Sequence, residues 1–335
     1  MNRKVRSGKK TIVFQVKVAL DSIDYIGQSK RAFRSQGIKG IHSYKQKKNT
    51  FSDCQNFVKW VRQHYQITAL QQLSPEHYHA YFAFMQEKGC GEGHMSNVET
   101  SLRLLQVAME NQWNVTFCPE KRLFSGQSKL QIRNRSYTDK EIELIEENCS
   151  EDVRKAVQLM SNLGLRLKEV VNLRGKHFTK KNGEYYLEIT DGAGVTKGGR
   201  FRKIIVQPQF KEALQNDLFW LGKDEYLVAV TANTVSSGVR RACLKAGIHQ
   251  DGRGCHGFRH SYARRRFQEL ANAEQKDMMA RILENRLKNR KADYGIISAT
   301  QKQLYKETVV VMNQVHSELG HGENRWALAL VYLQD

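Results

Sequence analysis

The segment His256-Gly-Phe-Arg259 brings together two side chains that suit chemistry on a phosphate group. On a helix, residues three apart share a face, so the imidazole and the guanidinium can address one ligand together. A planar guanidinium binds phosphate through two N–H groups, and an imidazole exchanges a proton near neutral pH. The same spacing occurs in basic helices that only contact a DNA backbone. The segment alone therefore leaves catalysis and DNA binding both open.

A second segment, Gly164-Leu-Arg166-Leu-Lys-Glu169, sets an arginine directly after a glycine turn. We expect this arginine to begin a short helix, and the N-terminus of a helix favours phosphate. Glu169 lies one helical turn further on and can fix the guanidinium in one pose. An ordinary surface pair is the common alternative at this spacing.

A third candidate, Tyr332, lies in the apolar run Trp326–Leu333, which predicts a helix. A tyrosine in such a helix is more often a core residue than a nucleophile. Its position after the segment Leu319-Gly320-His321 favours the nucleophile only through the family resemblance that follows.

In this order the segments resemble the catalytic domain of the tyrosine recombinase, or phage integrase, family. That family presents Gly-Leu-Arg-x-x-Glu, a lysine in a β-hairpin, His-x-x-Arg, Leu-Gly-His and then a tyrosine. The matching segments are Gly164-Leu165-Arg166-Leu-Lys-Glu169, Thr196-Lys197-Gly-Gly-Arg200, His256-Gly-Phe-Arg259, Leu319-Gly320-His321 and Tyr332. Five ordered matches argue against chance, and the resemblance covers residues 135–335.

The resemblance implies how the phosphate is held. Negative charge develops on the phosphate oxygens as the phosphodiester breaks, and two fixed guanidiniums, those of Arg166 and Arg259, would stabilise it without a metal. His321 would donate a further hydrogen bond to the same phosphate. Glu169 would support Arg166.

The resemblance also implies the proton transfers. Tyr332 would be the nucleophile and form a 3′-phosphotyrosyl bond, while His256 would take up or position its proton. Lys197 would protonate the leaving 5′ oxygen, with Arg200 and Lys203 as less favoured substitutes. The phosphotyrosyl bond conserves the phosphodiester energy, so religation would need no ATP.

The function implied is that of a site-specific DNA recombinase or integrase of a mobile genetic element, without cofactor or metal. Its partners would be double-stranded DNA with specific recombination sites, three further copies in a homo-tetramer on two DNA sites, and accessory DNA-bending proteins. We expect it in the bacterial cytoplasm or nucleoid. The alternatives are a type IB-like topoisomerase, which uses a similar set of side chains, and a non-catalytic DNA-binding regulator.

Composition agrees with a nucleic-acid partner. The 335 residues include 54 Lys and Arg against 34 Asp and Glu, a formal charge of +20, which attracts polyanions. No apolar run approaches the roughly 18 residues that span a bilayer, and no secretory signal is visible at the N-terminus. The six cysteines are scattered without metal-site spacing, so we expect reduced thiols.

The expected fold is mainly α with a small antiparallel β-sheet, arranged as a two-domain, C-shaped DNA clamp in which a helical core-binding domain joins an α+β catalytic domain. The expected segments are a basic N-terminal arm or linker (1–48), a helical core-DNA-binding domain (49–120), an interdomain linker (121–135) and the catalytic domain (136–335). Residues 183–206 have the β-rich pattern of a small hairpin or a three-stranded sheet. His256 and His321 are further apart than the family usually shows, so 270–308 is predicted to be a helical insertion.

Basic residues spread along the chain are candidate DNA contacts, and the arm is the densest region, with thirteen basic residues against two acidic ones. A solvated tail is nearly as good an interpretation of the arm. The candidate contacts are Lys9, Lys10, Arg31, Lys47, Lys48, Lys59, Arg62, Arg103, Arg200 and Arg264.

An apolar stripe in the predicted insertion has two interpretations of equal weight. Met278, Met279, Ile282, Leu283 and Leu287 recur at helical spacing. The stripe is either the contact between protomers or an added layer of the protomer's own core.

Overall fold

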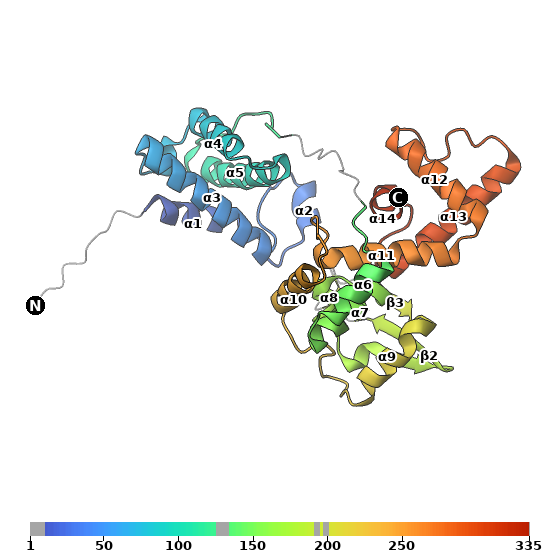
Figure 1. Ribbon diagram of the computed structural model, residues 1–335. Helices are drawn as coiled ribbons and strands as arrows, with labels where there is room; N and C mark the ends of the chain where they lie inside the picture. Colours follow the sequence, from blue (N-terminus) through green and yellow to red (C-terminus); the bar gives the residue numbers. More distant parts are fainter. Residues whose placement is uncertain (1–10, 125–133, 191–194, 197–200, 335) are drawn as a thin grey trace, which may run out of the picture. The chain divides into compact units, whose positions relative to one another are not determined.

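The computed structural model describes residues 11–124, 134–190, 195–196 and 201–334, and it divides into two compact units (Figure 1). Unit 1 is Met1–Gln131 and unit 2 is Ile132–Asp335. The described residues are mostly helical and contain one three-stranded antiparallel sheet, which confirms the prediction of a mainly α fold with a small antiparallel sheet. None of the described helices has the length and apolar character needed to cross a membrane.

Unit 1 is a bundle of helices around one apolar core. Its elements are α1 (Ile12–Asp21), α2 (Lys30–Ser35), α3 (Tyr44–Tyr65), the 3-10 turn η1 (Leu70–Gln72), α4 (Pro75–Glu87) and α5 (Glu92–Trp113). Helix α4 begins as its sequence predicts, with Ser74 as N-cap and Pro75 at the first helical position. The core is built from one face of each long helix, including Phe57 of α3, Tyr78 of α4 and Leu102 of α5, all fully buried.

The prediction of a separate basic arm over residues 1–48 is wrong for the described part of that segment. Helix α1 buries Val16 and Leu20 in the core and packs on α3 and α5. Lys47 of α3 forms ion pairs with Asp21 and Asp24, both at 2.6 Å, and these close the segment onto the bundle. The spacing of Ile12, Val16 and Leu20 is compatible with a helix, and this apolar face is part of the core of unit 1, whereas the high charge of the segment had favoured an arm.

Unit 2 begins with two helices whose ends follow their sequence signals. Its elements are α6 (Asp139–Glu147), α7 (Glu151–Leu163), α8 (Leu167–Val170), η2 (Gly175–His177), β1 (Phe178–Lys181), β2 (Glu184–Ile189), β3 (Arg202–Ile205), α9 (Pro208–Phe219), α10 (Ala232–Lys245), α11 (Gly254–Leu270), α12 (Ala273–Leu287), α13 (Ala299–Glu318) and α14 (Trp326–Leu333). The Thr138 hydroxyl accepts from the backbone N–H of Glu141, whose carboxylate accepts in return from the backbone N–H of Thr138, so α6 opens with a capping box. Helix α7 ends at Gly164 in the left-handed conformation.

The sheet has the order β1-β2-β3, with both pairs antiparallel. Phe178 lies opposite Leu187, and Leu187 lies opposite Ile204, so the inward residues of three strands meet in the core of unit 2. Strands β2 and β3 fall within the predicted β-rich region. Strand β1 lies before it and was not predicted, because Phe-Thr-Lys-Lys is too short and polar to show strand alternation.

Helix α11 runs through the middle of unit 2, with the sheet and α9 on one side and α12 to α14 on the other (Figure 1). It packs against α7, α10, α13 and α14. The predicted insertion is helical, as expected, and forms α12 and the start of α13.

The structure decides between the two interpretations of the apolar stripe on α12. Met278, Met279, Ile282 and Leu283 are each at most 3% exposed, and they pack against α13 and α14 of the same chain. The stripe is therefore an added layer of the protomer's own core, and the interpretation as a contact between protomers is wrong for these residues. Leu287, at 45% exposed, lies outside that layer.

Leu283→Ala is expected to destabilise unit 2 by about 2–5 kcal/mol, the usual cost of emptying a buried leucine site. Chemical denaturation measures this, and Leu287→Ala is the matched control, expected to change stability little because the side chain is exposed. A folded Leu283→Ala protein of normal stability that fails only to assemble on DNA would restore the interface interpretation.

Candidate active site

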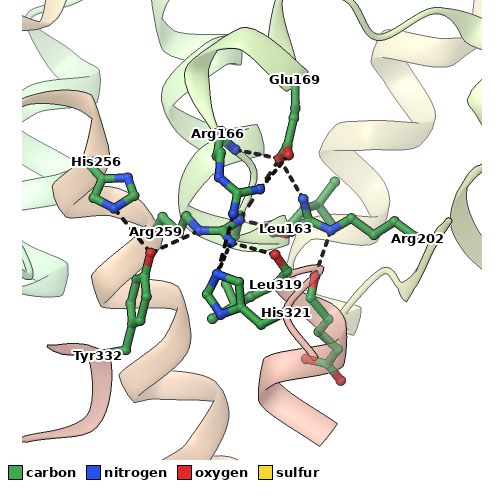
Figure 2. Close-up of polar contacts among 11 residues, drawn as sticks. Leu163, Arg166, Glu169, Arg202, His256, Arg259, Leu319, His321 and Tyr332 are labelled. Carbon is green, nitrogen blue, oxygen red and sulfur yellow. Dashed lines mark hydrogen bonds and ion pairs between the residues drawn. The ribbon is translucent and has the colours of Figure 1, made fainter. Parts of the chain in front are cut away.

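The candidate residues converge around the first half of α11 (Figure 2). His256 and Arg259 stand on this helix, Arg166 precedes α8, His321 follows α13 and Tyr332 lies on α14. Segments far apart in the sequence thus meet because α11 packs against α7, α13 and α14. The structure brings together the predicted catalytic residues that it describes.

The turn at Gly164 shapes the site. Its φ of +57° is left-handed, and a Cβ there would lie 2.3 Å from Cδ1 of Tyr262 and 2.9 Å from Cδ2 of Leu319. Only glycine adopts this φ readily and also has no Cβ to collide with these side chains. The carbonyl of Gly164 then points into the site and accepts from the guanidiniums of Arg259 and Arg202.

Glu169 is the anion at the centre of the arginine cluster, and its side chain is only 2% exposed. Its Oε1 accepts from Nη1 of Arg166 at 2.7 Å, and its Oε2 accepts from the backbone N–H of Arg166 at 2.8 Å. Oε2 also accepts from Nη1 of Arg202 at 2.6 Å. The carboxylate therefore fixes Arg166 in one pose, as its spacing predicts, and it does so as a buried ion pair.

Arg202 of β3 belongs to this cluster although no sequence motif pointed to it. The side chain is 1% exposed. Its Nε donates to the carbonyl of Glu318 at 2.7 Å, and its Nη2 donates to the carbonyl of Gly164 at 3.1 Å. Arg202 therefore ties the last strand, the glycine turn and the end of α13 to Glu169.

Arg259 is fully buried and uses its donors inside the site. Nη1 donates to the carbonyl of Gly164, and Nη2 donates to the carbonyl of Leu319. Nε lies 3.4 Å from the hydroxyl of Tyr332. The same guanidinium therefore holds the turn before Arg166 and faces the candidate nucleophile.

Tyr332 is 4% exposed, so it is a core residue of α14 as well as a site residue. Its hydroxyl lies 3.1 Å from Nε2 of His256 and within reach of Arg259 (Figure 2). The two interpretations of this tyrosine are compatible, because the ring packs in the core while the oxygen faces an imidazole and a guanidinium.

Comparisons with known proteins identify the fold. No family model and no curated protein matches the sequence. The XerH site-specific recombinase, in a post-cleavage complex with palindromic difH substrate, is 15% identical with a TM-score of 0.58 over 99% of this chain and 95% of that chain. The lambda integrase tetramer on a Holliday junction is 16% identical with a TM-score of 0.54, over 93% and 79%. The chain has the tyrosine recombinase fold.

A third similar structure is the Tn1549 transposon integrase in complex with a circular intermediate DNA. It is 12% identical, with a TM-score of 0.54 over 97% of this chain and 96% of that chain. The tyrosine recombinase fold is the one that the order of the five segments predicts.

Within the tyrosine recombinase fold, His321 sits between two guanidiniums. Its Nε2 lies 3.1 Å from Nη2 of Arg259 and 3.4 Å from Nη2 of Arg166. Because guanidinium nitrogens only donate, Nε2 accepts in this arrangement. Burial, followed by the charge of Arg259, lowers the pKa of His321 to about 2, so the ring is neutral.

The other ionisable groups of the site respond to the same burial and positive charge. Loss of solvent, then Arg259 and Arg166, lowers the pKa of His256, although part of this residue is exposed. Burial and Arg202 lower the pKa of Arg259 to about 10, which leaves it charged at neutral pH. Burial alone would raise the pKa of Glu169, but Arg202 and Arg166 outweigh it and the pKa is lowered.

Lys197 and Arg200, the predicted hairpin lysine and its substitute, lie outside the described residues, as do Lys9 and Lys10. Lys203 instead forms an ion pair with Glu188 at 2.8 Å on the sheet. Among the residues described, no group of three or more His, Cys, Asp or Glu side chains could hold a metal ion.

The predicted DNA contacts of unit 1 fall into two groups. Arg31, Lys48, Lys59 and Arg62 are exposed. Lys47 is held by its ion pairs within unit 1, and Arg103 pairs with the buried Glu99 at 3.3 Å and donates to the carbonyl of Pro119 at 2.8 Å. These two side chains hold unit 1 together, which argues against them as DNA contacts. Arg264 of α11 is half-buried.

Proposed function

We propose that the chain is a site-specific DNA recombinase or integrase that cuts and rejoins DNA through a 3′-phosphotyrosyl intermediate. The observation that carries this proposal is the Tyr332 hydroxyl, which faces His256 at 3.1 Å and Arg259 at 3.4 Å inside one cluster of arginines. A regulator that only holds DNA has no need for a buried phenol aimed at an imidazole. The proposed catalytic side chains are Arg166, Lys197, His256, Arg259, His321 and Tyr332, with Glu169 in support.

The proposed reaction exchanges one phosphate ester for another. The Tyr332 oxygen attacks phosphorus, its proton passes to Nε2 of His256, and the bond from phosphorus to the 5′ oxygen breaks. The leaving 5′ oxygen takes a proton from Lys197. The distance of 3.1 Å between the Tyr332 hydroxyl and Nε2 supports the role of His256 as proton acceptor, and the lowered pKa of His256 keeps the ring neutral before the reaction, so Nε2 is free to accept the proton.

Charge stabilisation falls mainly to Arg166. Its side chain is 29% exposed, whereas that of Arg259 is fully buried and already engaged by two carbonyls. We therefore assign the direct phosphate contact to Arg166 and the positioning of the Tyr332 hydroxyl to Arg259. When DNA binds, His321 would turn from the guanidiniums and take the tautomer that carries hydrogen on Nε2, so that Nε2 donates to the phosphate.

We also propose a homo-tetramer on two DNA sites, with accessory DNA-bending proteins, in the bacterial cytoplasm or nucleoid. The similar lambda integrase structure, a tetramer on a Holliday junction, supports the tetramer. Residues 1–10 and the exposed face of unit 1 would join the DNA contacts.

Trapping of a covalent complex tests the function. The protein would be incubated with nicked or suicide DNA substrates drawn from a library, denatured, and analysed for protein joined to a 3′ end. Sequencing the recovered DNA would give the recognised site. The complex is expected to form in the presence of EDTA and without ATP, and cleavage that leaves a free 3′ end would contradict the proposal.

A basic face of α3 is the proposed backbone contact of unit 1. Lys48, Lys59 and Arg62 are exposed and lie on one side of the helix, since eleven residues make about three turns. Affinity for DNA falls as salt rises, and the plot of log affinity against log salt has a negative slope. Replacing all three residues by Ala is expected to make this slope less steep by about 0.9 for each phosphate that the protein no longer neutralises. Filter binding at several salt concentrations measures this. Lys47→Met, which removes an internally paired charge, is the control, and an equal change of slope in both proteins would refute the assignment.

A further inference from the structure

His260 is a buried imidazole that the proposed mechanism does not use. It stands on α11, one residue after Arg259 and one helical turn after His256. The residue is 1% exposed. Its ring lies against the ring of Tyr332, with centroids 4.4 Å apart and planes tilted by 30°.

The same imidazole also contacts the proposed proton acceptor. The rings of His260 and His256 are 5.1 Å apart and nearly perpendicular, at 82°. His260 therefore touches both partners of the hydrogen bond between His256 and Tyr332. A displacement of its ring would disturb the nucleophile and the acceptor together.

Neither ring nitrogen of His260 has a hydrogen-bond partner among the described residues. Burial, followed by the neighbouring His256, Arg135 and Arg264, lowers the pKa of His260 to about 3, so the ring is neutral at physiological pH. What the ring offers Tyr332 is thus a flat, uncharged face.

We propose that His260 is a positioning residue that stacks on the Tyr332 ring and holds the phenol oxygen toward His256 and the phosphate. The inference rests on the proposed function of the site. A tyrosine side chain on a helix retains rotation about its bonds, and a second ring packed on its face restricts that rotation. The stack fixes the ring plane, while His256 and Arg259 fix the oxygen.

The role of the ring, as distinct from its nitrogens, is tested with a pair of variants. Single-turnover cleavage of a suicide substrate, at protein concentrations that saturate the DNA, separates the chemical step from binding. His260→Ala is expected to slow covalent complex formation by roughly three- to tenfold, the effect of losing one aromatic pair. His260→Phe restores a flat ring without nitrogens and is expected to recover most of the rate and the wild-type pH profile.

A modified leaving group separates nucleophile positioning from leaving-group protonation. A substrate with sulfur in place of the bridging 5′ oxygen expels a thiolate, which needs no general acid. His260→Ala should be slowed equally on both substrates, whereas Lys197→Ala should be rescued on the sulfur substrate. Rescue of His260→Ala by sulfur, or a His260→Phe protein as slow as His260→Ala, would overturn the positioning role.

A substitution elsewhere in the core, Phe267→Leu, is the control for general destabilisation. Phe267→Leu removes a buried ring two turns further along α11. Among the described residues, the rings that pair with Tyr332 are those of His256, His260 and His321. Phe267→Leu is therefore expected to lower the melting temperature. It should not slow cleavage when the protein concentration saturates the DNA. An equal loss of rate in Phe267→Leu and His260→Ala would also overturn the proposal.

The stack can be observed without DNA. In protein labelled at tyrosine, the ring-proton NMR signals of Tyr332, assigned by their loss in Tyr332→Phe, should move in His260→Ala and return toward wild-type positions in His260→Phe. Unchanged signals in His260→Ala would refute the stack. If the signals move as expected in the two variants but wild-type protein forms no covalent DNA complex, the stack is supported and the proposed function is refuted.

Discussion

Tyr332→Phe is expected to abolish the covalent protein–DNA complex completely. The substitution removes the attacking oxygen and keeps the ring that packs on His260 and in the core of α14. Because phosphate contacts and net charge dominate DNA affinity and neither changes, the affinity should stay within about twofold of wild type. Gel analysis after denaturation measures the complex, and filter binding measures the affinity. Covalent product that persists in this variant would exclude Tyr332 as the nucleophile.

A mixing experiment extends this prediction to the question of which chain supplies the nucleophile. Helix α14 packs against α11 of its own chain, and Tyr332 meets His256 and Arg259 of that chain. Tyr332→Phe mixed with Arg259→Ala should therefore form no covalent complex, because neither protein has a complete site. Recovered cleavage in the mixture would mean that Tyr332 serves the site of another protomer.

The sequence predicted the proposed catalytic residues better than the residues that hold them in place. Arg166, His256, Arg259, His321 and Tyr332 stand in short segments whose order and spacing resemble a known family, and the structure brings all of them together. Chemistry limits the residue types that can serve at these positions, so local patterns reveal them. The catalytic role of each residue is part of the proposed function.

Arg202 was missed because burial of an arginine depends on partners that are distant in sequence. Its acceptors come from the glycine turn, α8 and the end of α13. The run Arg-Lys-Ile-Ile shows no alternation of polar and apolar residues, so nothing local reveals that Arg202 and Ile204 are buried on the same face of β3. An arginine on the inward face of a strand needs an acid or carbonyls in the core.

His260 was missed because α11 has no single apolar face in its sequence. Every residue from Gly257 to Ala263 is buried, so the polar and apolar positions do not reveal which side of the helix faces the site. The N-terminal segment was misread because its charge outweighed the apolar spacing of Ile12, Val16 and Leu20. Charge describes the exposed side of a helix, and only the packing of α1 on α3 and α5 shows that the other side is needed.

The loss of the Glu169 charge is expected to have the largest effect on stability. Glu169→Gln keeps the shape of the side chain but removes the anion that Arg166 and Arg202 share, and it leaves a guanidinium charge uncompensated in the core. Breaking a buried ion pair from one side costs about 3–5 kcal/mol. For a unit the size of unit 2, this corresponds to a fall in melting temperature of roughly 10 °C. Cleavage should fall as well, because Arg166 loses its fixed pose.

The pH dependence distinguishes lost charge from a packing defect. The pKa of Glu169 is lowered in the folded protein, so its contribution to stability is present above the pKa of the unfolded carboxyl and is lost as the pH falls through the folded pKa. The difference in unfolding free energy between wild type and Glu169→Gln should therefore be constant near neutral pH and shrink under acid conditions, below about pH 4.5. Glu188→Gln, which breaks exposed pairs with Lys203 and Lys181, is the matched control and should change stability little. A stability difference for Glu169→Gln that does not depend on pH would show that the carboxylate acts by its shape and not by its charge.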